Sequence, residues 1–171
     1  LDRVGWPPPG APRVSAEGGI VGWGWDSAGM ARSTSLDHGT LDAMLLRQHN
    51  VVTRPQALAA GMTDAALRRR LRPEGPWQVL LPMVYLAVTG APTIDQRDMA
   101  ALLYAGSDSV ITGQAALRRL GLANHRPEAV DVLVSVTVQR RSCGFVRLQR
   151  TRRLPDRACS DGDIRFVAVD R

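Results

Sequence analysis

Lysine is absent from the 171 residues, and all 22 basic side chains are arginine. This absence excludes Schiff-base chemistry, a phosphate-binding loop that needs its lysine, and the lysine of common metal-dependent nuclease motifs. An arginine-only basic set is typical of GC-rich coding sequence, so part of the arginine content reflects genome composition. With 16 acidic residues, the net charge is still +6, which favours a polyanionic partner, nucleic acid above all.

Cysteine and long apolar runs are also scarce. Cys143 and Cys159 are the only cysteines, without a CxxC pair or a histidine at ligand spacing, whereas a zinc site needs about four ligands. We expect two reduced thiols. The longest apolar run, Val79–Val88, contains Pro82 and is far shorter than the roughly 20 residues that cross a bilayer. No stretch resembles a secretion signal, so we expect a cytoplasmic protein.

Known catalytic patterns are missing as well. The histidines are isolated in the sequence: His38, His49 and His125. No GxSxG or HExxH motif occurs. Asp161-Gly162-Asp163 lacks the remaining ligands of a calcium loop and indicates a turn. Asp95 and Asp98 lie one turn apart near a helix start, where they complement the helix dipole. We predict no enzymatic activity, no metal site and no cofactor.

Residues 1–40 differ in composition from the rest of the chain. They hold 8 of the 16 glycines and three of the four tryptophans, and show no helical or strand periodicity. Such a segment cannot offset its ordering entropy by burial, so we predict a disordered leader. A start of translation at Met30 or Met44 fits the sequence equally well.

Residues 41–90 have the pattern of a winged helix-turn-helix domain. An apolar helical face (Leu41, Met44 and Leu45) comes first. Thr53-Arg54-Pro55-Gln56 is a capping box for a helix that Gly61 ends. Thr63 then caps a second helix, which we expect Gly75 to end. Two capped helices within about 20 residues are typical of a helix-turn-helix.

The second helix turns arginines away from its apolar side. Leu67 and Leu71 form the inner stripe, and Arg69 points almost directly away from them. Arg68 and Arg72 flank Arg69, Arg70 lies towards the other edge, and the small Ala65 precedes them. A recognition helix needs close approach at its beginning and guanidinium groups further along. A solvated amphipathic helix with surplus arginine is the alternative interpretation.

Two β-prone runs follow this helix, Trp77–Leu81 and Met83–Val88, separated by Pro82. Proline cannot donate to a strand ladder, so it belongs in the turn between two strands, which would form a wing. We expect Trp77 and Tyr85 to pack in the core and join the wing to the helices.

Residues 91–171 predict a small α/β domain, which makes the whole chain α+β. Residues 95–122 are helical, with Met99, Leu102 and Leu103 on one apolar face and Gly121 as terminator. Alternating valines predict a half-buried strand over residues 130–138. We expect residues 145–150 to be its antiparallel hairpin partner, and residues 164–169 to form a last strand.

Residues 139–157 carry a second basic cluster, seven arginines against Asp156. Outward positions such as Arg147, Gln149 and Arg152 could rest on a phosphate backbone. An edge strand guarded by charge against aggregation explains the same pattern.

The ordered segments resemble a known family. The run "VVTRPQALAAGMTDAALRRRLRPEGPWQVLLPMVYL", followed by "AALLYAGSDSVITGQAALRRLGL", "VDVLVSV" and "RTRRLPD…DGDIRFVAVDR", is similar to actinobacterial proteins with an AbiEi-type antitoxin N-terminal domain. These are antitoxin-like components of type IV toxin–antitoxin (abortive phage infection) systems. The resemblance covers about residues 44–170.

The resemblance implies a winged helix-turn-helix that binds and represses its own promoter. A following α/β domain would help to counter a nucleotidyltransferase toxin indirectly. By position, Thr63–Arg72 would be the recognition helix and Trp77–Val88 the wing. Two departures are visible: Met83 stands where the family usually has glycine in the wing turn, and the chain stops before the Vsr-like nuclease domain of many relatives.

We therefore predict a sequence-specific repressor of the antitoxin kind that binds double-stranded DNA. The alternatives are the DNA-targeting part of a truncated nuclease-like protein, or a protein-interaction module that has lost DNA binding. The residues that we expect to contact DNA are Arg54, Thr63, Asp64, Ala65, Arg68, Arg69, Arg72, Arg147, Arg150 and Arg152.

Overall fold

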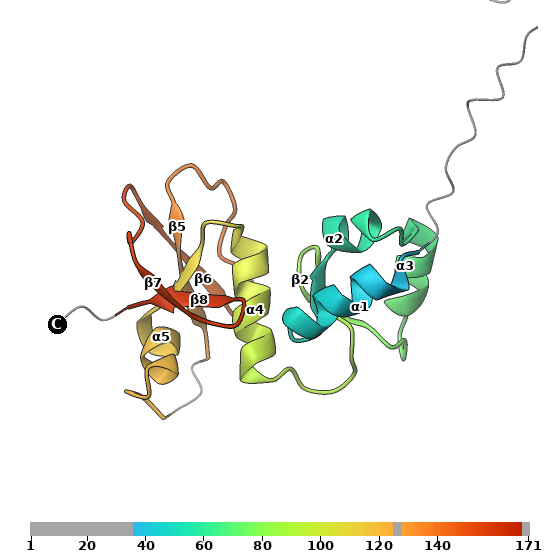
Figure 1. Ribbon diagram of the computed structural model, residues 1–171, viewed down its shortest axis with the longest axis horizontal. Coiled ribbons are helices and arrows are strands. Elements are labelled where there is room, and N and C mark those ends of the chain that lie inside the picture. The colour runs from blue at the N-terminus through green and yellow to red at the C-terminus, as the bar shows by residue number, and fades with distance from the viewer. Residues whose placement is uncertain (1–35, 125–127, 169–171) are drawn as a thin grey trace, which may run out of the picture. The chain divides into compact units, whose positions relative to one another are not determined.

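The computed structural model describes residues 36–124 and 128–168, which form a mixed α+β fold as predicted (Figure 1). In chain order its elements are α1 (His38–Arg47), β1 (Val51–Thr53), α2 (Arg54–Ala59), α3 (Asp64–Arg70), β2 (Gln78–Leu81), β3 (Val84–Leu86), α4 (Ile94–Ala105), β4 (Val110–Thr112), α5 (Gly113–Arg119), β5 (Val130–Ser135), β6 (Val146–Thr151), β7 (Ala158–Asp161) and β8 (Ile164–Val167). Most of the predicted leader lies outside the described residues, and α1 already begins at His38.

The first six elements build three helices around a three-stranded antiparallel sheet of order β1-β3-β2. β2 and β3 form the hairpin that Pro82 predicts, with Leu81 opposite Val84 across the turn. Met83 has a φ of 65°, a conformation that favours glycine, because a Cβ crowds the backbone there. The Met83 carbonyl accepts a hydrogen bond from the Arg54 amide at 2.9 Å, which ties the turn to α2.

The remaining strands form a five-stranded mixed sheet of order β6-β5-β4-β8-β7. β4 lies at its centre, antiparallel to β5 and parallel to β8. β5 has the predicted half-buried alternation, with Val130, Val132 and Val134 buried and the residues between them partly exposed. β7 and β8 form an antiparallel hairpin around Gly162, so the turn predicted at residues 161–163 is confirmed.

The predicted hairpin between residues 130–138 and 145–150 is wrong. β5 and β6 are adjacent but parallel, with Val130 opposite Val146 and Ser135 opposite Thr151. The first strand ends at Ser135 rather than at residue 138, and residues 136–145 return the chain to the start of β5. Parallel neighbours need such a crossover, whereas a hairpin needs only a tight turn.

The helical stretch predicted over residues 95–122 is also interrupted. α4 ends at Ala105, and Gly106 follows with a φ of 114°. Val110–Thr112 is the central strand β4, and α5 starts directly after it. Three residues are too few to produce an alternation that is visible between two helical patterns.

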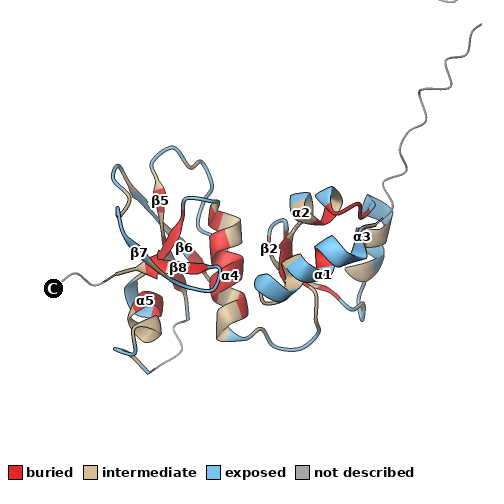
Figure 2. Ribbon diagram, viewed as in Figure 1, coloured by how far each residue is buried: buried red, intermediate tan, exposed pale blue. Residues whose placement is uncertain are grey.

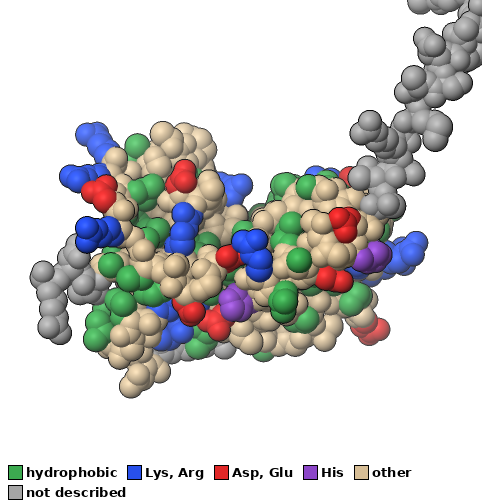
Figure 3. Space-filling model, viewed as in Figure 1, with side chains coloured by type: hydrophobic (Ala, Val, Ile, Leu, Met, Phe, Trp, Pro, Cys, Tyr) green, Lys and Arg blue, Asp and Glu red, His purple; other side chains and the backbone are tan. Residues whose placement is uncertain are grey.

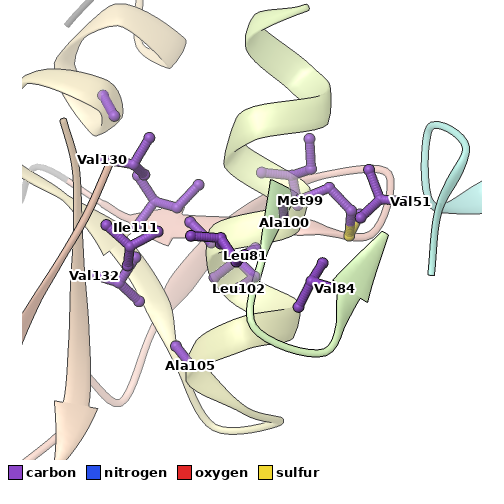
Figure 4. Packing of buried hydrophobic residues seen from close by; sticks show 14 of the residues in the cluster. Val51, Leu81, Val84, Met99, Ala100, Leu102, Ala105, Ile111, Val130 and Val132 are labelled. Atoms are coloured by element: carbon purple, nitrogen blue, oxygen red, sulfur yellow. The ribbon is translucent and has the colours of Figure 1, made fainter. Parts of the chain in front are cut away.

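α4 packs against both sheets, and it is buried along most of its length (Figures 1 and 2). Met99 lies beside Val51 of the first sheet, whereas Leu102 belongs to the same hydrophobic cluster as Ile111 of the second (Figure 4). This cluster therefore includes buried residues on both sides of residue 90, where we placed a domain boundary. Among the described residues, no helix has the length and apolar character needed to span a bilayer.

Candidate nucleic-acid interface

α2, a glycine turn and α3 are built by the local signals that the sequence carries. The Thr53 hydroxyl accepts from the Gln56 amide, and the Gln56 side chain accepts from the Thr53 amide, so the capping box is confirmed. Gly61 follows α2 with a φ of 86°. The Thr63 hydroxyl then accepts from the Ala66 amide at 3.1 Å and caps α3. These contacts fix where each helix begins.

A second hydrophobic cluster holds α3 in place through one side only. Leu67 of α3 is 3% exposed and belongs to a cluster with Met62, Trp77 and Tyr85. Both aromatic residues are buried, which confirms their predicted packing role. The other side of α3 is left to solvent.

The solvent-exposed side of α3 carries four of the residues that we expect to contact DNA. Asp64, Ala65, Arg68 and Arg69 are all exposed. Among the described residues, neither Arg68 nor Arg69 has an ion pair with a carboxylate. Their guanidinium groups are therefore free to meet an external anion.

Arg70 and Arg72 are placed differently from their neighbours. The Arg70 guanidinium lies 5.6 Å from the centre of the Trp77 ring, and the Arg70 carbonyl accepts from the Trp77 amide. Arg70 therefore anchors the hairpin. Arg72 is exposed but follows the last helical residue, because α3 ends at Arg70, before the predicted stop at Gly75.

Arg54 and Asp64 form an ion pair of 2.6 Å, which joins the first turns of α2 and α3. Their side chains are 35% and 51% exposed, so both remain accessible. A carboxylate at this position repels phosphate, and the Arg54 charge offsets that repulsion. The pair therefore keeps the beginning of α3 close to neutral.

The β2–β3 hairpin offers an apolar tip rather than a basic one. Val79 is 61% exposed and Met83 51% exposed, next to the exposed Pro82. Gln78 fixes the base of the hairpin, because its Nε2 donates to the carbonyls of Val88 and Gly90.

The second basic cluster extends over the crossover before β6, over β6 itself, an edge strand of the five-stranded sheet, and over the loop that follows. Arg147 on β6 and Arg152 just after it are exposed. The Arg150 guanidinium donates instead to the backbone carbonyls of Val138 and Arg140, so it holds the crossover in place. This cluster and α3 belong to different layers of the fold, and Figure 3 shows basic side chains at separate places on the face drawn.

A buried ionic network is the polar feature that sequence reasoning missed. Asp98 is 1% exposed and accepts from Arg118 at 2.6 Å and from Arg119 at 2.8 Å. Arg119 also pairs with Asp95 and Asp161. Burial raises the pKa of Asp98, and the charges of Arg119 and Arg118 oppose that rise. Helix-dipole complementarity therefore accounts for only part of the placement of Asp95 and Asp98.

No group of three or more possible metal ligands gathers within residues 36–124 and 128–168. The comparisons with known proteins add no relative: no family model matches the chain, and no curated protein matches it.

Proposed function

We propose that this protein binds double-stranded DNA, with α3 as the recognition helix and the β2–β3 hairpin as a wing. The order helix–strand–helix–helix–strand–strand around a small antiparallel sheet is that of a winged helix-turn-helix, and it supports this proposal. The major groove is about 12 Å wide and admits one α-helix.

One observation carries the proposal: Arg68 and Arg69 stand exposed on α3 without a carboxylate partner among the described residues, Arg69 opposite the buried Leu67 and Arg68 beside it. An acid and an arginine four residues apart on a helix surface, such as Asp64 and Arg68, can form an ion pair. Here the acid of the first turn, Asp64, is already paired with Arg54. The exposed Ala65 leaves room for close approach to base edges at the start of the helix.

The proposed biological role is repression of the protein's own promoter, as an antitoxin-like component. This role rests on the resemblance to AbiEi-type antitoxins, in which DNA binding and an α/β domain occur together. A nucleotidyltransferase toxin would be countered indirectly. Expression of the chain with a neighbouring toxin gene, scored by cell growth and by promoter activity, tests this role.

The DNA proposal is tested by fluorescence anisotropy of the full chain on DNA from upstream of its gene and on scrambled DNA, across a salt series. We expect tighter binding to the upstream DNA at every salt concentration. Affinity should fall with salt by a log–log slope of about −0.9 for each phosphate that an arginine neutralises.

Replacement of Arg69 by alanine should weaken binding to the upstream DNA by about 1–3 kcal/mol if this side chain reads a base. Arg47→Ala, which removes the same charge from an exposed side chain outside α3 and outside the 139–157 basic cluster, is the matched control. Equal weak binding to both DNAs, lost at moderate salt and unaffected by the Arg69 change, would refute sequence-specific binding. No DNA affinity in a folded protein would favour a protein-interaction module instead.

A further inference from the structure

A cavity of about 980 Å³ lies between the end of α1, the start of α2, the β2–β3 turn, the side of α4 and the β7–β8 hairpin. Its apolar lining comes from α4, where Met99 and Leu102 are buried and Leu103 is partly exposed, and from the β2–β3 turn and the start of α2. The volume is at the upper end of the range of about 300–1,000 Å³ that is usual for small-molecule sites. An occupant with a substantial apolar body would fit this surface.

Positive charge surrounds the apolar surface. Arg47, Arg140 and Arg165 line the cavity, against the single carboxylate of Asp163. Arg47 pairs with Asp163 at 3.0 Å, in an exposed contact that an external anion can exchange. After this pairing, two guanidinium groups remain without a carboxylate partner among the described residues.

The two remaining arginines are held in different ways. Arg140 lies 5.7 Å from the centre of the Tyr104 ring and donates to the carbonyls of Leu103 and Tyr104, at the end of α4. Arg165 is partly exposed on β8, where its backbone pairs with Ser160, and its guanidinium has no hydrogen bond or ion pair to another described residue. A guanidinium that is not held by a carboxylate can form charge-assisted hydrogen bonds with an incoming anion, so Arg165 is the group best placed to bind one.

Gln48 adds a neutral polar group to the same lining. Its Oε1 atom is buried, and no donor among the described residues reaches it. Because this oxygen is closed to solvent, it does not face the open cavity, and an occupant would contact the rest of the Gln48 side chain.

We propose that this cavity binds a small amphipathic anion, with an apolar body on α4 and a carboxylate, sulfonate or phosphate group at Arg165 and Arg140. The apolar lining favours a ligand with an apolar part, and the excess of guanidinium groups over carboxylates favours a ligand with a negative charge. The inference does not depend on DNA binding, because none of these groups lies on α3.

The test uses the full chain and two fluorescent probes of nearly equal shape. Anilinonaphthalene sulfonate carries an anionic group, an N–H and two aromatic bodies, and N-phenylnaphthylamine is its neutral counterpart. Fluorescence titration should give saturable one-site binding of the anionic probe, at least about tenfold tighter than that of the neutral probe. The anionic probe should also raise the melting temperature, as a ligand of the folded state does.

Two substitutions locate the site. Arg165→Gln should weaken the affinity for the anionic probe by about tenfold or more and leave the affinity for the neutral probe unchanged. Arg157→Gln, at an exposed site outside the cavity, should change neither affinity. Ser107→Trp fills the exposed rim of the cavity and should weaken the affinity for both probes. Near-ultraviolet circular dichroism establishes that each variant is folded.

Three outcomes would overturn the proposal. The first is equal affinity for the two probes in the wild-type protein. The second is an equal loss of affinity for the anionic probe in Arg165→Gln and Arg157→Gln, which would indicate non-specific charge attraction. The third is binding that lowers the melting temperature, which would indicate a probe that prefers partly unfolded chains.

Discussion

Replacement of Arg119 by methionine removes the cation at the centre of the buried network and keeps most of its apolar volume. The Arg119 side chain is 4% exposed and pairs with Asp98 at 2.8 Å, Asp95 at 2.6 Å and Asp161 at 3.0 Å. Asp95 and Asp161 are 50% and 74% exposed, so water replaces the lost contacts and each pair contributes only about 0–1 kcal/mol. Asp98 cannot reach water in this way.

The magnitude therefore depends mainly on Asp98, which is 1% exposed. A buried charge that loses its partner typically costs about 3–5 kcal/mol. Arg118 still pairs with Asp98 at 2.6 Å, which places the expected loss near the lower end, at about 3 kcal/mol. Urea unfolding followed by circular dichroism at neutral pH measures this loss as a change in the free energy of unfolding.

A second substitution separates lost charge pairing from lost packing. Asp98→Asn in the Arg119→Met background removes the stranded charge, so the double variant should be more stable than Arg119→Met alone by about 1 kcal/mol or more. Arg153→Met is the control, because Arg153 pairs with Asp156 where both side chains are well exposed. The reasoning fails if Arg119→Met costs no more than Arg153→Met, or if the added Asp98→Asn lowers stability further.

Three further predictions concern stability and are measured by the same unfolding assay. Met83→Gly should raise the free energy of unfolding by up to about 1 kcal/mol, because relief of the left-handed backbone (about 1–2 kcal/mol) exceeds the added chain entropy of glycine; a fall would show that the side chain is needed. Thr53→Ala should cost about 1 kcal/mol through loss of the helix cap, and Thr53→Ser should recover most of it. Because burial raises the pKa of Asp98, the folded protein binds this proton more tightly than the unfolded chain does. The stability that Asp98 contributes relative to Asp98→Asn should therefore fall as pH rises from the ordinary aspartate pKa of about 3.9 through the raised value, and a rise in the same interval would contradict the stated cause.

Local signals in the sequence were sufficient for the starts of α2 and α3 and for the β2–β3 hairpin, but not for the short strand β1 or the end of α3. The capping box at Thr53, the cap at Thr63 and the buried positions of Trp77 and Tyr85 depend on residues close in the chain or on side-chain type alone. The exposed face of α3 follows from helical periodicity once Leu67 is buried.

Long-range features could not be obtained in the same way. The direction in which β6 pairs with β5 depends on the path of residues 136–145, and alternation is the same for parallel and antiparallel neighbours. The partners Asp98 and Arg119 are 21 residues apart and meet only because α5 returns to α4 after the short strand β4. No periodic pattern encodes such a meeting.

The shared core along α4 has a consequence for how this chain can be rearranged. A cut or a fusion joint near residue 90 would expose the apolar side of α4 and the strand residues beneath it, Val84 and Leu86 among them. The N-terminal helices and the hairpin are therefore not expected to fold independently, and a chimeric protein should keep residues 36–168 together. Mutations in either sheet should act on one common unfolding transition, so a destabilised variant should lose the proposed DNA surface and the cavity together.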